Sequence, residues 1–479
     1  MRRHRRPRGG RWIARPTAAL VAALLGLSAP LVGHHGHAAS RPGGPAPRPA
    51  AQMAAPTRQD RILVLVPHSD DESAGCGGLI AEAVEAGAAV HVVYTTNGDA
   101  FRVAAQRLFF ENSVPPQDYR RLARLRQEES LAALGKLGVR RDQVIFLGYP
   151  DRGTDQMWLR HWQPDDPYRS PYTKQDHNAY ADSLRPGAPY SGRALLDDLE
   201  TTIRQFRPTI IMSAHPRDIH GDHWALYCYT VGALYEIGLL DQVKVRLYLV
   251  HRADKWRGPD GRRLDPSLLP AGTDEIRTRW ESLPLTPAAA ERKREAILEH
   301  HTQLLAMRDY LLNFARGREV FGQVPAQEWP EVGPGRLRVT GKESDWSSIQ
   351  PAVLAPAENP GAEDRLGLRA ARQGDRLFLL LDLAQPLSPG VECRVHLHLL
   401  SGRRVEGPQT YSFSVGRTTS GARFRTAARW LEASFPLPRG SSPDGVMLAA
   451  ETWRGSTRLA HTPWVVLMTA RPRRAACLR

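Results

Sequence analysis

The sequence predicts an α/β domain with an open parallel sheet and helices on both faces, followed by a smaller all-β sandwich. Short runs of aliphatic and β-branched residues occur five times before residue 251, and segments with helical spacing separate most of them. This alternation is typical of parallel strands joined by crossover helices. Beyond residue 325 the pattern changes to short runs, several alternating, spaced by Gly, Pro and Ser, which predicts a sandwich.

The first domain is expected to be Rossmann-like. Its expected strands lie at residues 61–67, 90–94, 143–147, 208–213 and 243–250, and its expected helices at 75–87, 121–138, 193–206, 224–240 and 287–314. Residues 152–192 interrupt this order with six Trp and Tyr residues among Pro and Asp. We interpret them either as a lid or binding loop that stacks on sugar rings, or as a surface loop packed by its own aromatic residues.

The N-terminus has the pattern of a signal peptide over residues 1–38. A basic start precedes a short apolar run, and small residues near Ala38 provide a cleavage site. A retained membrane anchor is the alternative, and it would be the chain's one contact with a membrane. Residues 39–59 are Pro- and Ala-rich and predict a disordered linker. We therefore expect a secreted or cell-envelope protein, with one domain over 60–325 and the sandwich over 326–479.

Charge and cysteine content exclude some classes of function. The net charge is +15, but seven arginines and no acid lie in the first 38 residues. The rest of the chain has no compact Lys/Arg block with interleaved aromatic residues, which argues against nucleic-acid binding. The four cysteines form no C-x-x-C pair. They are expected to be small buried residues rather than metal ligands or a disulfide framework.

Polar loops follow four of the expected strands. They are PHSDDE (67–72), TTNGDAF (95–101), GYPDRG (148–153) and AHPRDIHGDH (214–223). Because the carboxyl ends of parallel strands lie at one edge of a sheet, where ligands bind, these loops should converge.

The first and last of these loops carry metal-binding residue types. His68, Asp70 and Asp71 lie close together in one, and three histidines and two aspartates lie within nine residues in the other. Buried carboxylates need a cation or a dense hydrogen-bond network, and a His/Asp set suits Zn²⁺. Helix capping is the alternative for the first loop alone. The sequence lacks G-x-S-x-G, and Gly75 to Gly78 do not have dinucleotide-binding spacing, so these glycines are expected to allow close packing.

PHSDDE with the later HGDH resembles the PIG-L/LmbE-type zinc deacetylases, which remove acetyl from N-acetylglucosamine units. The resemblance covers about residues 60–325. It implies that His68, Asp71 and His223 hold one zinc ion per chain. It also implies that Asp70 is the general base, and that His220 stabilises the oxyanion or protonates the leaving amine. Further roles follow with less support: substrate contacts from Arg126, Asp151 and Asp99, and support of the ligands by Asp222 and His215.

These features lead us to expect a secreted zinc-dependent deacetylase acting on an N-acetylglucosamine-type sugar of a glycan, glycolipid or glycoconjugate. The alternatives are a glycan-binding surface protein with an inactive metal fold, and a metal-dependent amidase acting on a non-sugar amide. The C-terminal region loosely resembles DOMON-like and family-9 carbohydrate-binding sandwiches. That resemblance implies attachment to a cell-wall or surface glycan, and a purely structural sandwich is the alternative.

Overall fold

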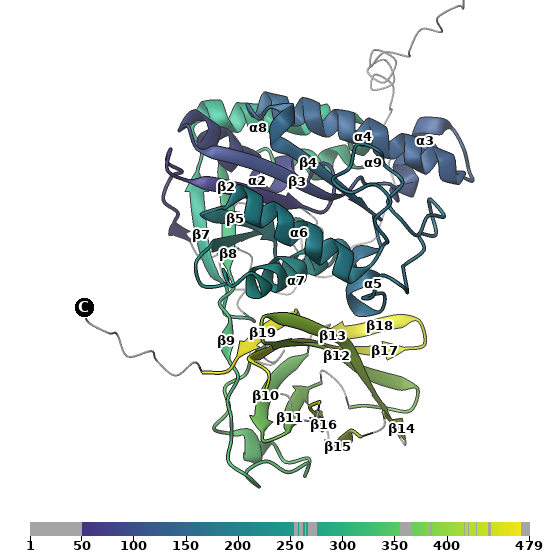
Figure 1. Ribbon diagram of the computed structural model, residues 1–479, viewed down its shortest axis with the longest axis vertical. Helices are drawn as coiled ribbons and strands as arrows, with labels where there is room; N and C mark the ends of the chain where they lie inside the picture. Colours follow the sequence, from purple (N-terminus) through teal and green to yellow (C-terminus); the bar gives the residue numbers. More distant parts are fainter. Residues whose placement is uncertain are drawn as a thin grey trace, which may run out of the picture.

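The computed structural model describes residues 50–252, 257, 262–263, 265–266, 275–354, 366–383, 386–415, 417–419, 421–427, 429–438 and 442–470. Helices and a large sheet form one half of the molecule, and a β-sandwich forms the other (Figure 1). The expected signal peptide, the expected linker up to residue 49, and Cys477 lie outside the described residues. None of the described helices combines the length and apolar character that a membrane crossing needs.

An eight-stranded, mostly parallel sheet forms the centre of the first half. Its order is β1-β7-β8-β6-β5-β2-β3-β4, and β6, β5, β2, β3 and β4 are parallel, which confirms the predicted sheet. β8 pairs antiparallel with β6 and β7. The sequence did not indicate these extra strands because their polar and apolar residues are mixed. The bounds are β1 (Ala51–Gln52), β2 (Arg61–Val66), β3 (Ala89–Thr96), β4 (Val144–Tyr149), β5 (Ile210–Ala214), β6 (Lys244–Tyr248), β7 (Arg279–Pro284) and β8 (Arg318–Gln323).

Helices cover both faces of this sheet, with α2, α4, α8 and α9 on one side and α6 and α7 on the other (Figure 1). Along β2, Ile62, Val64 and Val66 join the first core, and Leu63 and Leu65 join the second. Successive strand side chains point to opposite faces, so a doubly covered strand must be apolar throughout. The helices are α2 (Asp71–Glu85), α3 (Arg102–Phe109), α4 (Pro116–Lys136), α5 (Thr154–Leu159), α6 (Gly192–Phe206), α7 (Gly221–Glu236), α8 (Pro287–Glu299) and α9 (His301–Leu312).

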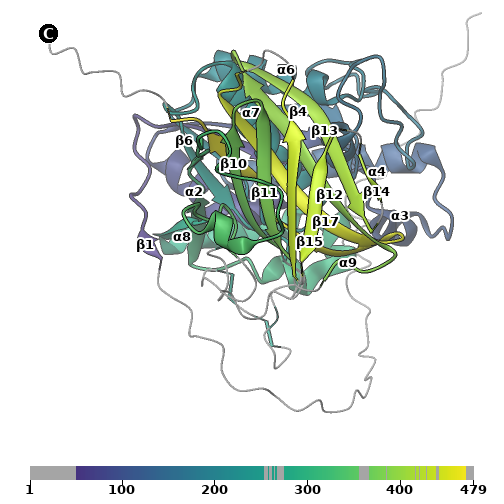
Figure 2. The ribbon, with the colours of Figure 1, turned by 90° about the horizontal axis from the view of Figure 1, so that it is seen from below.

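Two sheets form the sandwich. One has the order β10-β11-β16-β15, and the other β14-β13-β12-β17-β19-β9 with β18 paired to β17. Figure 2 views the molecule from this side, with the smaller sheet in front of the larger. The strands are β9 (Gln327–Glu328), β10 (Gly367–Gln373), β11 (Arg376–Asp382), β12 (Val391–Ser401), β13 (Arg404–Ser414), β14 (Arg417–Thr418), β15 (Arg423–Ala427), β16 (Trp430–Pro436), β17 (Gly445–Arg454), β18 (Thr457–His461) and β19 (Val465–Met468).

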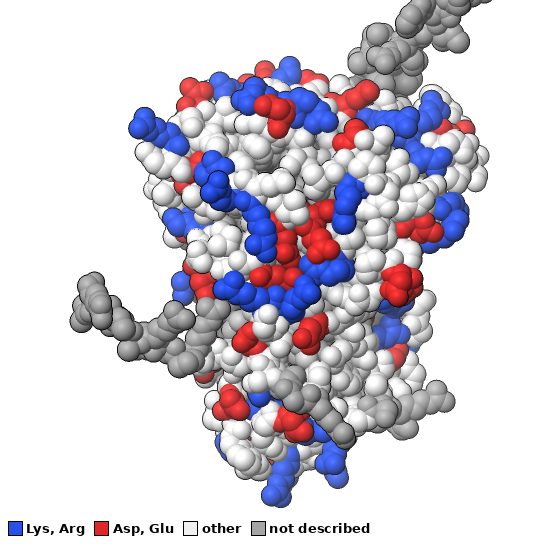
Figure 3. All heavy atoms as spheres, viewed as in Figure 1, with Lys and Arg blue, Asp and Glu red and all other residues white. Residues whose placement is uncertain are grey.

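The larger sandwich sheet is buried on both faces near the helices. On β17, Val446 and Leu448 pack between the two sandwich sheets, while Met447 and Ala449 join the core of α5, α6 and α7. Polar contacts strengthen this junction: Tyr235 at the end of α7 donates to Asp444, and the next carboxylate, Glu236, accepts from a backbone N–H of β13. Acidic and basic side chains gather over α6 and α7 beside the junction (Figure 3), where Arg193 pairs with Asp197, Glu200 and Glu236.

Three local expectations differ from the structure. A disordered linker over residues 50–59 is wrong, because Ala51 and Gln52 pair with β7 and Met53 is buried. One helix over 287–314 is also wrong, because the backbone of His300 (φ −81°, ψ 63°) separates α8 from α9. Residues 152–192 include α5, and four of their six aromatic residues, among them Trp158 and Tyr190, are buried. These four rings therefore pack inward, whereas residues 163–166 and 184–187 of the segment are exposed.

The expected close packing at the glycines of α2 is confirmed. A side-chain carbon at Gly75 would lie 2.8 Å from the ring of Tyr248, and one at Gly78 would lie 2.2 Å from Leu285. Cys76, Cys228 and Cys393 are buried and unpaired, as expected.

Trp158 joins the two halves of the molecule, so we predict that Trp158→Ala destabilises the whole chain. The ring is fully buried and stacks on His398 of β12 at 4.0 Å, and His398 Nε2 contacts the Trp158 carbonyl oxygen at 3.0 Å. Truncating a buried tryptophan costs about 3–5 kcal/mol. Denaturant unfolding checks this, with Phe110→Ala as the control, since that ring is 80% exposed and its loss should cost at most about 0.5 kcal/mol. Equal effects of the two substitutions would contradict this assignment.

Candidate metal centre

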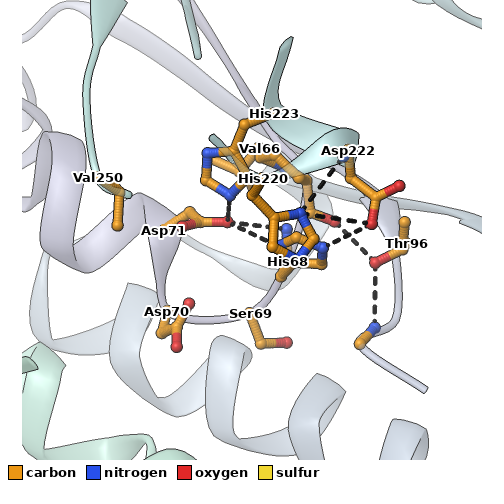
Figure 4. A network of polar contacts seen from close by, with 12 residues as sticks. Val66, His68, Ser69, Asp70, Asp71, Thr96, His220, Asp222, His223 and Val250 are labelled. Carbon is orange, nitrogen blue, oxygen red and sulfur yellow. Dashed lines mark hydrogen bonds and ion pairs between the residues drawn. The ribbon is translucent and has the colours of Figure 1, made fainter. Parts of the chain in front are cut away.

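The polar loops converge at the carboxyl end of the parallel strands, as predicted. His68 follows β2, Asp99 follows β3, Asp151 follows β4, and His220 follows β5 and caps α7. His251, three residues after β6, joins them. Chain segments far apart in sequence thus bring imidazoles and carboxylates within contact distance (Figure 4).

Carboxylates and imidazoles alternate in a continuous row, here called the His–Asp chain. Asp71 Oδ2 lies between the two predicted histidine ligands, 3.2 Å from His68 Nδ1 and 3.2 Å from His223 Nε2. Beyond His68, Nε2 contacts Asp222 Oδ2 at 3.0 Å. Beyond His223, Nδ1 lies 3.1 Å from Asp218 Oδ2, and Asp218 Oδ1 lies 3.3 Å from His251 Nδ1. All of these groups except His251 are buried.

The donor atoms fit a divalent metal ion. Both ring nitrogens of His223, Asp71 Oδ1 and Asp151 Oδ1 are buried and form no hydrogen bond of normal geometry among the described residues, although His223 and Asp151 lie within ion-pair distance of their neighbours. Two N/O ligands of a tetrahedral zinc ion lie about 3.3 Å apart, close to the 3.2 Å separations around Asp71 Oδ2.

More than one ligand set is available at this position. Three sets have donor atoms that all lie within 4.8 Å of one another: His68 with His220 and His223; His68 with Asp151, His220 and Asp222; and Asp71 with His223 and His251. The predicted triad of His68, Asp71 and His223 is joined through Asp71 and is not one of these sets. The ligand roles therefore stay a prediction, with His220 and His251 as neighbours of the same site.

Mutual charge controls protonation along the His–Asp chain. Burial alone would lower the pKa of His223, but Asp218 and Asp71 raise it to about 10. Burial alone would also lower the pKa of His68, but Asp151, Asp222 and Asp71 raise it well above its ordinary value. Burial alone would raise the pKa of Asp71, but His223 and His68 lower it well below its ordinary value. At neutral pH the rings of His68 and His223 thus hold protons that a metal ion must displace. Metal binding should therefore weaken as the pH falls.

Asp222 and Asp218 orient the two imidazoles. Asp222 accepts from Thr154 through the backbone N–H and the hydroxyl, and from the backbone N–H of Arg152, besides contacting His68. Asp218 accepts from the backbone N–H groups of His220 and His251. The predicted orienting role of Asp222 agrees with these contacts. The matching role of Asp218 was missed, although its position in HPRDIHGDH was the available signal.

Asp70 occupies a strained position beside the His–Asp chain. Its φ of 99° is rare for a residue other than glycine and costs about 1–3 kcal/mol. Glu72 holds this turn by accepting from the Asp70 N–H, and His300 contacts Glu72 at 2.7 Å in a fully buried pair. Burial and the neighbouring Asp71 carboxylate raise the pKa of Asp70 to about 7, which suits a base working near neutral pH.

His220 is available as a neutral hydrogen-bond donor. Its Nδ1 accepts from the backbone N–H of Asp222, so the ring proton lies on Nε2. Burial and the nearby His68 lower the pKa of His220 to about 3, which keeps the ring neutral. Its side chain is 21% exposed, more than the rings of His68 and His223.

The predicted substrate contacts fall at different depths. Arg126 is buried and donates to the carbonyl oxygens of Ser69 and Gly98, so it positions two loops. Gly98 has φ +65°, and a side chain there would meet the Arg126 guanidinium. Asp99 is fully buried and accepts from Tyr180 and from the Asp151 N–H, so it lies behind the site wall. The structure thus shows buried contacts of Arg126 and Asp99 with the loops of the site, and their substrate contacts stay a prediction.

Asp151 and His215 differ in their distance from the centre. Asp151 Oδ1 lies 3.4 Å from His68 Nε2 and belongs to one of the ligand sets. His215 stacks on Trp280, and its two nitrogens contact Thr278 and the Arg217 N–H. Both nitrogens of His215 are thus engaged away from the predicted ligands, and its supporting role stays a prediction. The sequence did not reveal the pairs of Asp218 with His251 and of Glu72 with His300 at this site, because their partners lie 33 and 228 residues apart.

Known proteins resemble this chain in the region that carries most of the site. A family model described as PIG-L, GlcNAc-PI de-N-acetylase, matches residues 63–234. Two 1D-myo-inositol 2-acetamido-2-deoxy-alpha-D-glucopyranoside deacetylases, from Mycobacterium sp. strains KMS and JLS, are each 31% identical over 176 residues. The match covers 36% of this chain, and the chain spans about half the length (50%) of these curated relatives.

Solved structures of low identity also align with this chain. N,N′-diacetylchitobiose deacetylase from Pyrococcus horikoshii is 18% identical, with a TM-score of 0.35, over 56% of this chain and 86% of that one. A deacetylase of the A40926 pseudoaglycone is 21% identical, with a TM-score of 0.37, over 56% and 100%. The residues matched by the family model include every member of the His–Asp chain except His251. Residues 63–234 form a domain of the PIG-L family.

Proposed function

We propose that this protein is an exported zinc-dependent deacetylase that hydrolyses the N-acetyl amide of an N-acetylglucosamine-type sugar on a glycan, glycolipid or glycoconjugate. The observation that carries the proposal is the position of Asp71 between His68 and His223, with Asp70 next to it in sequence and His220 at the same rim. The mycobacterial relatives are named as deacetylases of an acetamido sugar, which supports the same chemistry. Export rests on the signal-peptide pattern of residues 1–38.

His68, Asp71 and His223 would hold the zinc ion, which supplies Lewis-acid chemistry and water activation when bound. Asp222 and Asp218 keep the imidazoles in fixed orientations, as carboxylate partners of metal-bound histidines do. This arrangement resists rotation of either ring because each has a carboxylate on both sides.

Asp70 accepts a proton from the water that attacks the acetyl carbon. His220 Nε2–H donates a hydrogen bond to the carbonyl oxygen as negative charge develops there. The neutral state of His220 favours this role over acid catalysis, because loss of its remaining ring proton would leave an anion. Asp70 then passes its proton to the sugar nitrogen as the C–N bond breaks. The products are acetate and the free amino sugar, so atoms and protons balance.

We predict that Asp70→Asn lowers kcat for acetate release by about 10²–10⁴-fold, the usual contribution of a general base. The amide keeps the size of the side chain but cannot accept the proton. Acetate release from N-acetylglucosamine and N,N′-diacetylchitobiose by the zinc-loaded protein measures the effect. Asp142→Asn, at an exposed position away from the site, is the matched control. Unchanged kcat in Asp70→Asn would refute the mechanism, and zinc binding without hydrolysis by the native protein would favour a binding protein.

The orienting role of Asp218 gives a second prediction. Asp218→Asn should weaken Zn²⁺ affinity by about 10–100-fold, because the amide no longer holds His223 as a charged carboxylate does. Competition with a chromogenic chelator measures the affinity. The exposed Asp165→Asn variant should bind zinc like the native protein. Equal affinity of all three proteins would show that His223 does not need Asp218 to bind the metal.

A further inference from the structure

The two ring nitrogens of His68 face different groups. Nδ1 lies 3.2 Å from Asp71 Oδ2, whereas Nε2 faces two other carboxylates (Figure 4). Asp222 Oδ2 lies 3.0 Å from Nε2, and Asp151 Oδ1 lies 3.4 Å from it. A carboxylate that holds the outer nitrogen of an imidazole fixes the direction in which the other nitrogen points. The contacts that hold Asp222 and Asp151 therefore bear on the metal centre.

Asp222 is held by the start of the segment 152–192. Thr154 Oγ1 donates to Asp222 Oδ1 at 2.6 Å, and the Thr154 N–H donates to the same oxygen at 3.0 Å. The Arg152 N–H donates at 2.7 Å to Asp222 Oδ2, the oxygen that contacts His68. Arg152 has φ 59°, a left-handed conformation that is uncommon for a residue other than glycine. Of these three donors, the Thr154 hydroxyl is the one that a side-chain substitution removes.

Asp151 is held by the same segment through Asp99. Tyr180 Oη donates to Asp99 Oδ2 at 2.6 Å, and Asp99 Oδ1 accepts from the Asp151 N–H at 3.1 Å. In return, Asp151 Oδ2 accepts from the Ala100 N–H at 2.9 Å. These contacts connect the loops after β3 and β4 in both directions, and they leave Asp151 Oδ1 facing His68.

Tyr180 is itself fixed to the central sheet. Its N–H donates to Asn178 Oδ1 at 3.1 Å, and Asn178 Nδ2 donates to the carbonyl oxygen of Leu147 in β4 at 2.7 Å. Gly148 has φ +76°, and a side-chain carbon there would lie 2.6 Å from Asn178 Oδ1. Tyr180 and Asn178 are both buried. The Tyr180 hydroxyl is thus held in place independently of Asp99, as a positioning group requires.

We propose that Thr154 and Tyr180 are positioning residues of the metal centre, which fix the ring of His68 through Asp222 and Asp151. The inference rests on the zinc ligands of the proposed function. The segment that contains both residues then acts on the metal through buried carboxylates, a role that neither a lid nor a surface loop would have.

Zinc affinity of the full chain, measured by competition with a chromogenic chelator, tests the proposal without relying on activity. Thr154→Val keeps the shape of the side chain without its hydroxyl, so it should raise the Kd for Zn²⁺ about tenfold. Thr154→Ser keeps the hydroxyl and should keep the native Kd. Tyr180→Phe acts through one residue more and should raise the Kd about threefold, within the range for the loss of one hydrogen bond.

Two substitutions in the same segment are matched controls. Tyr190→Phe removes a buried hydroxyl that forms no hydrogen bond among the described residues. Thr173→Val removes a buried hydroxyl that, within the described part of the chain, accepts only from the Gln175 N–H at 3.5 Å. Both should bind zinc like the native protein. Equal weakening by the controls and by Thr154→Val and Tyr180→Phe would overturn the proposal.

The nitrogen NMR spectrum of the histidine rings in the metal-free protein separates the two proposals. Thr154→Val and Tyr180→Phe should shift the Nε2 resonance of His68, which is assigned from its loss in His68→Asn, and the controls should not. A shift in a protein that binds no zinc would support the positioning role and count against the proposed function alone. Native zinc affinity and an unshifted resonance in both variants would overturn the positioning role and leave the proposed deacetylase intact.

Discussion

The contact of one buried carboxylate, Asp71, with two imidazoles is the interaction on which the rest of the site depends. A carboxylate buried alone would be costly, and so would a pair of buried imidazolium ions. Alternation of the two signs resolves both costs, and it extends outward through Asp222 and Asp218. Each outer carboxylate is in turn held by backbone N–H groups of the loops after other strands. The backbone N–H groups of the loops therefore stabilise the buried carboxylates, and the ion pairs of these carboxylates connect the loops to one another.

The same logic explains the buried groups around Asp70. Its left-handed backbone conformation is compatible with folding because Glu72, Arg126 and Gln303 hold the neighbouring peptide groups. Ser69 donates to the Arg126 carbonyl oxygen and accepts from Ser130. The turn at Asp70 is thus held by contacts with α2, α4 and α9. The sandwich packs against α5 through the stacking of His398 on Trp158.

The strands and the meeting of their polar loops could be predicted from the sequence, because a doubly buried strand must be apolar and its end must carry the turn. The contacts among His68, Asp71 and His223 followed from the same reasoning together with the family resemblance. The pairs of Asp218 with His251 and of Glu72 with His300 could not be predicted, since no periodicity links partners across such loops. The family resemblance assigned Arg126 and Asp99 to substrate contacts, and only the fold reveals that both side chains are buried. The aromatic residues of 152–192 were ambiguous for the same reason.

The most direct test of the central claim is X-ray absorption at the zinc K-edge on the purified protein. The account predicts one zinc ion per chain with a first shell of nitrogen and oxygen at about 2.0–2.2 Å and outer-shell scattering from two imidazoles. The outer-shell signal should decrease in His223→Ala. A sulfur shell at about 2.3 Å, or a protein that retains no zinc after exposure to the ion, would contradict a metal centre built on the His–Asp chain.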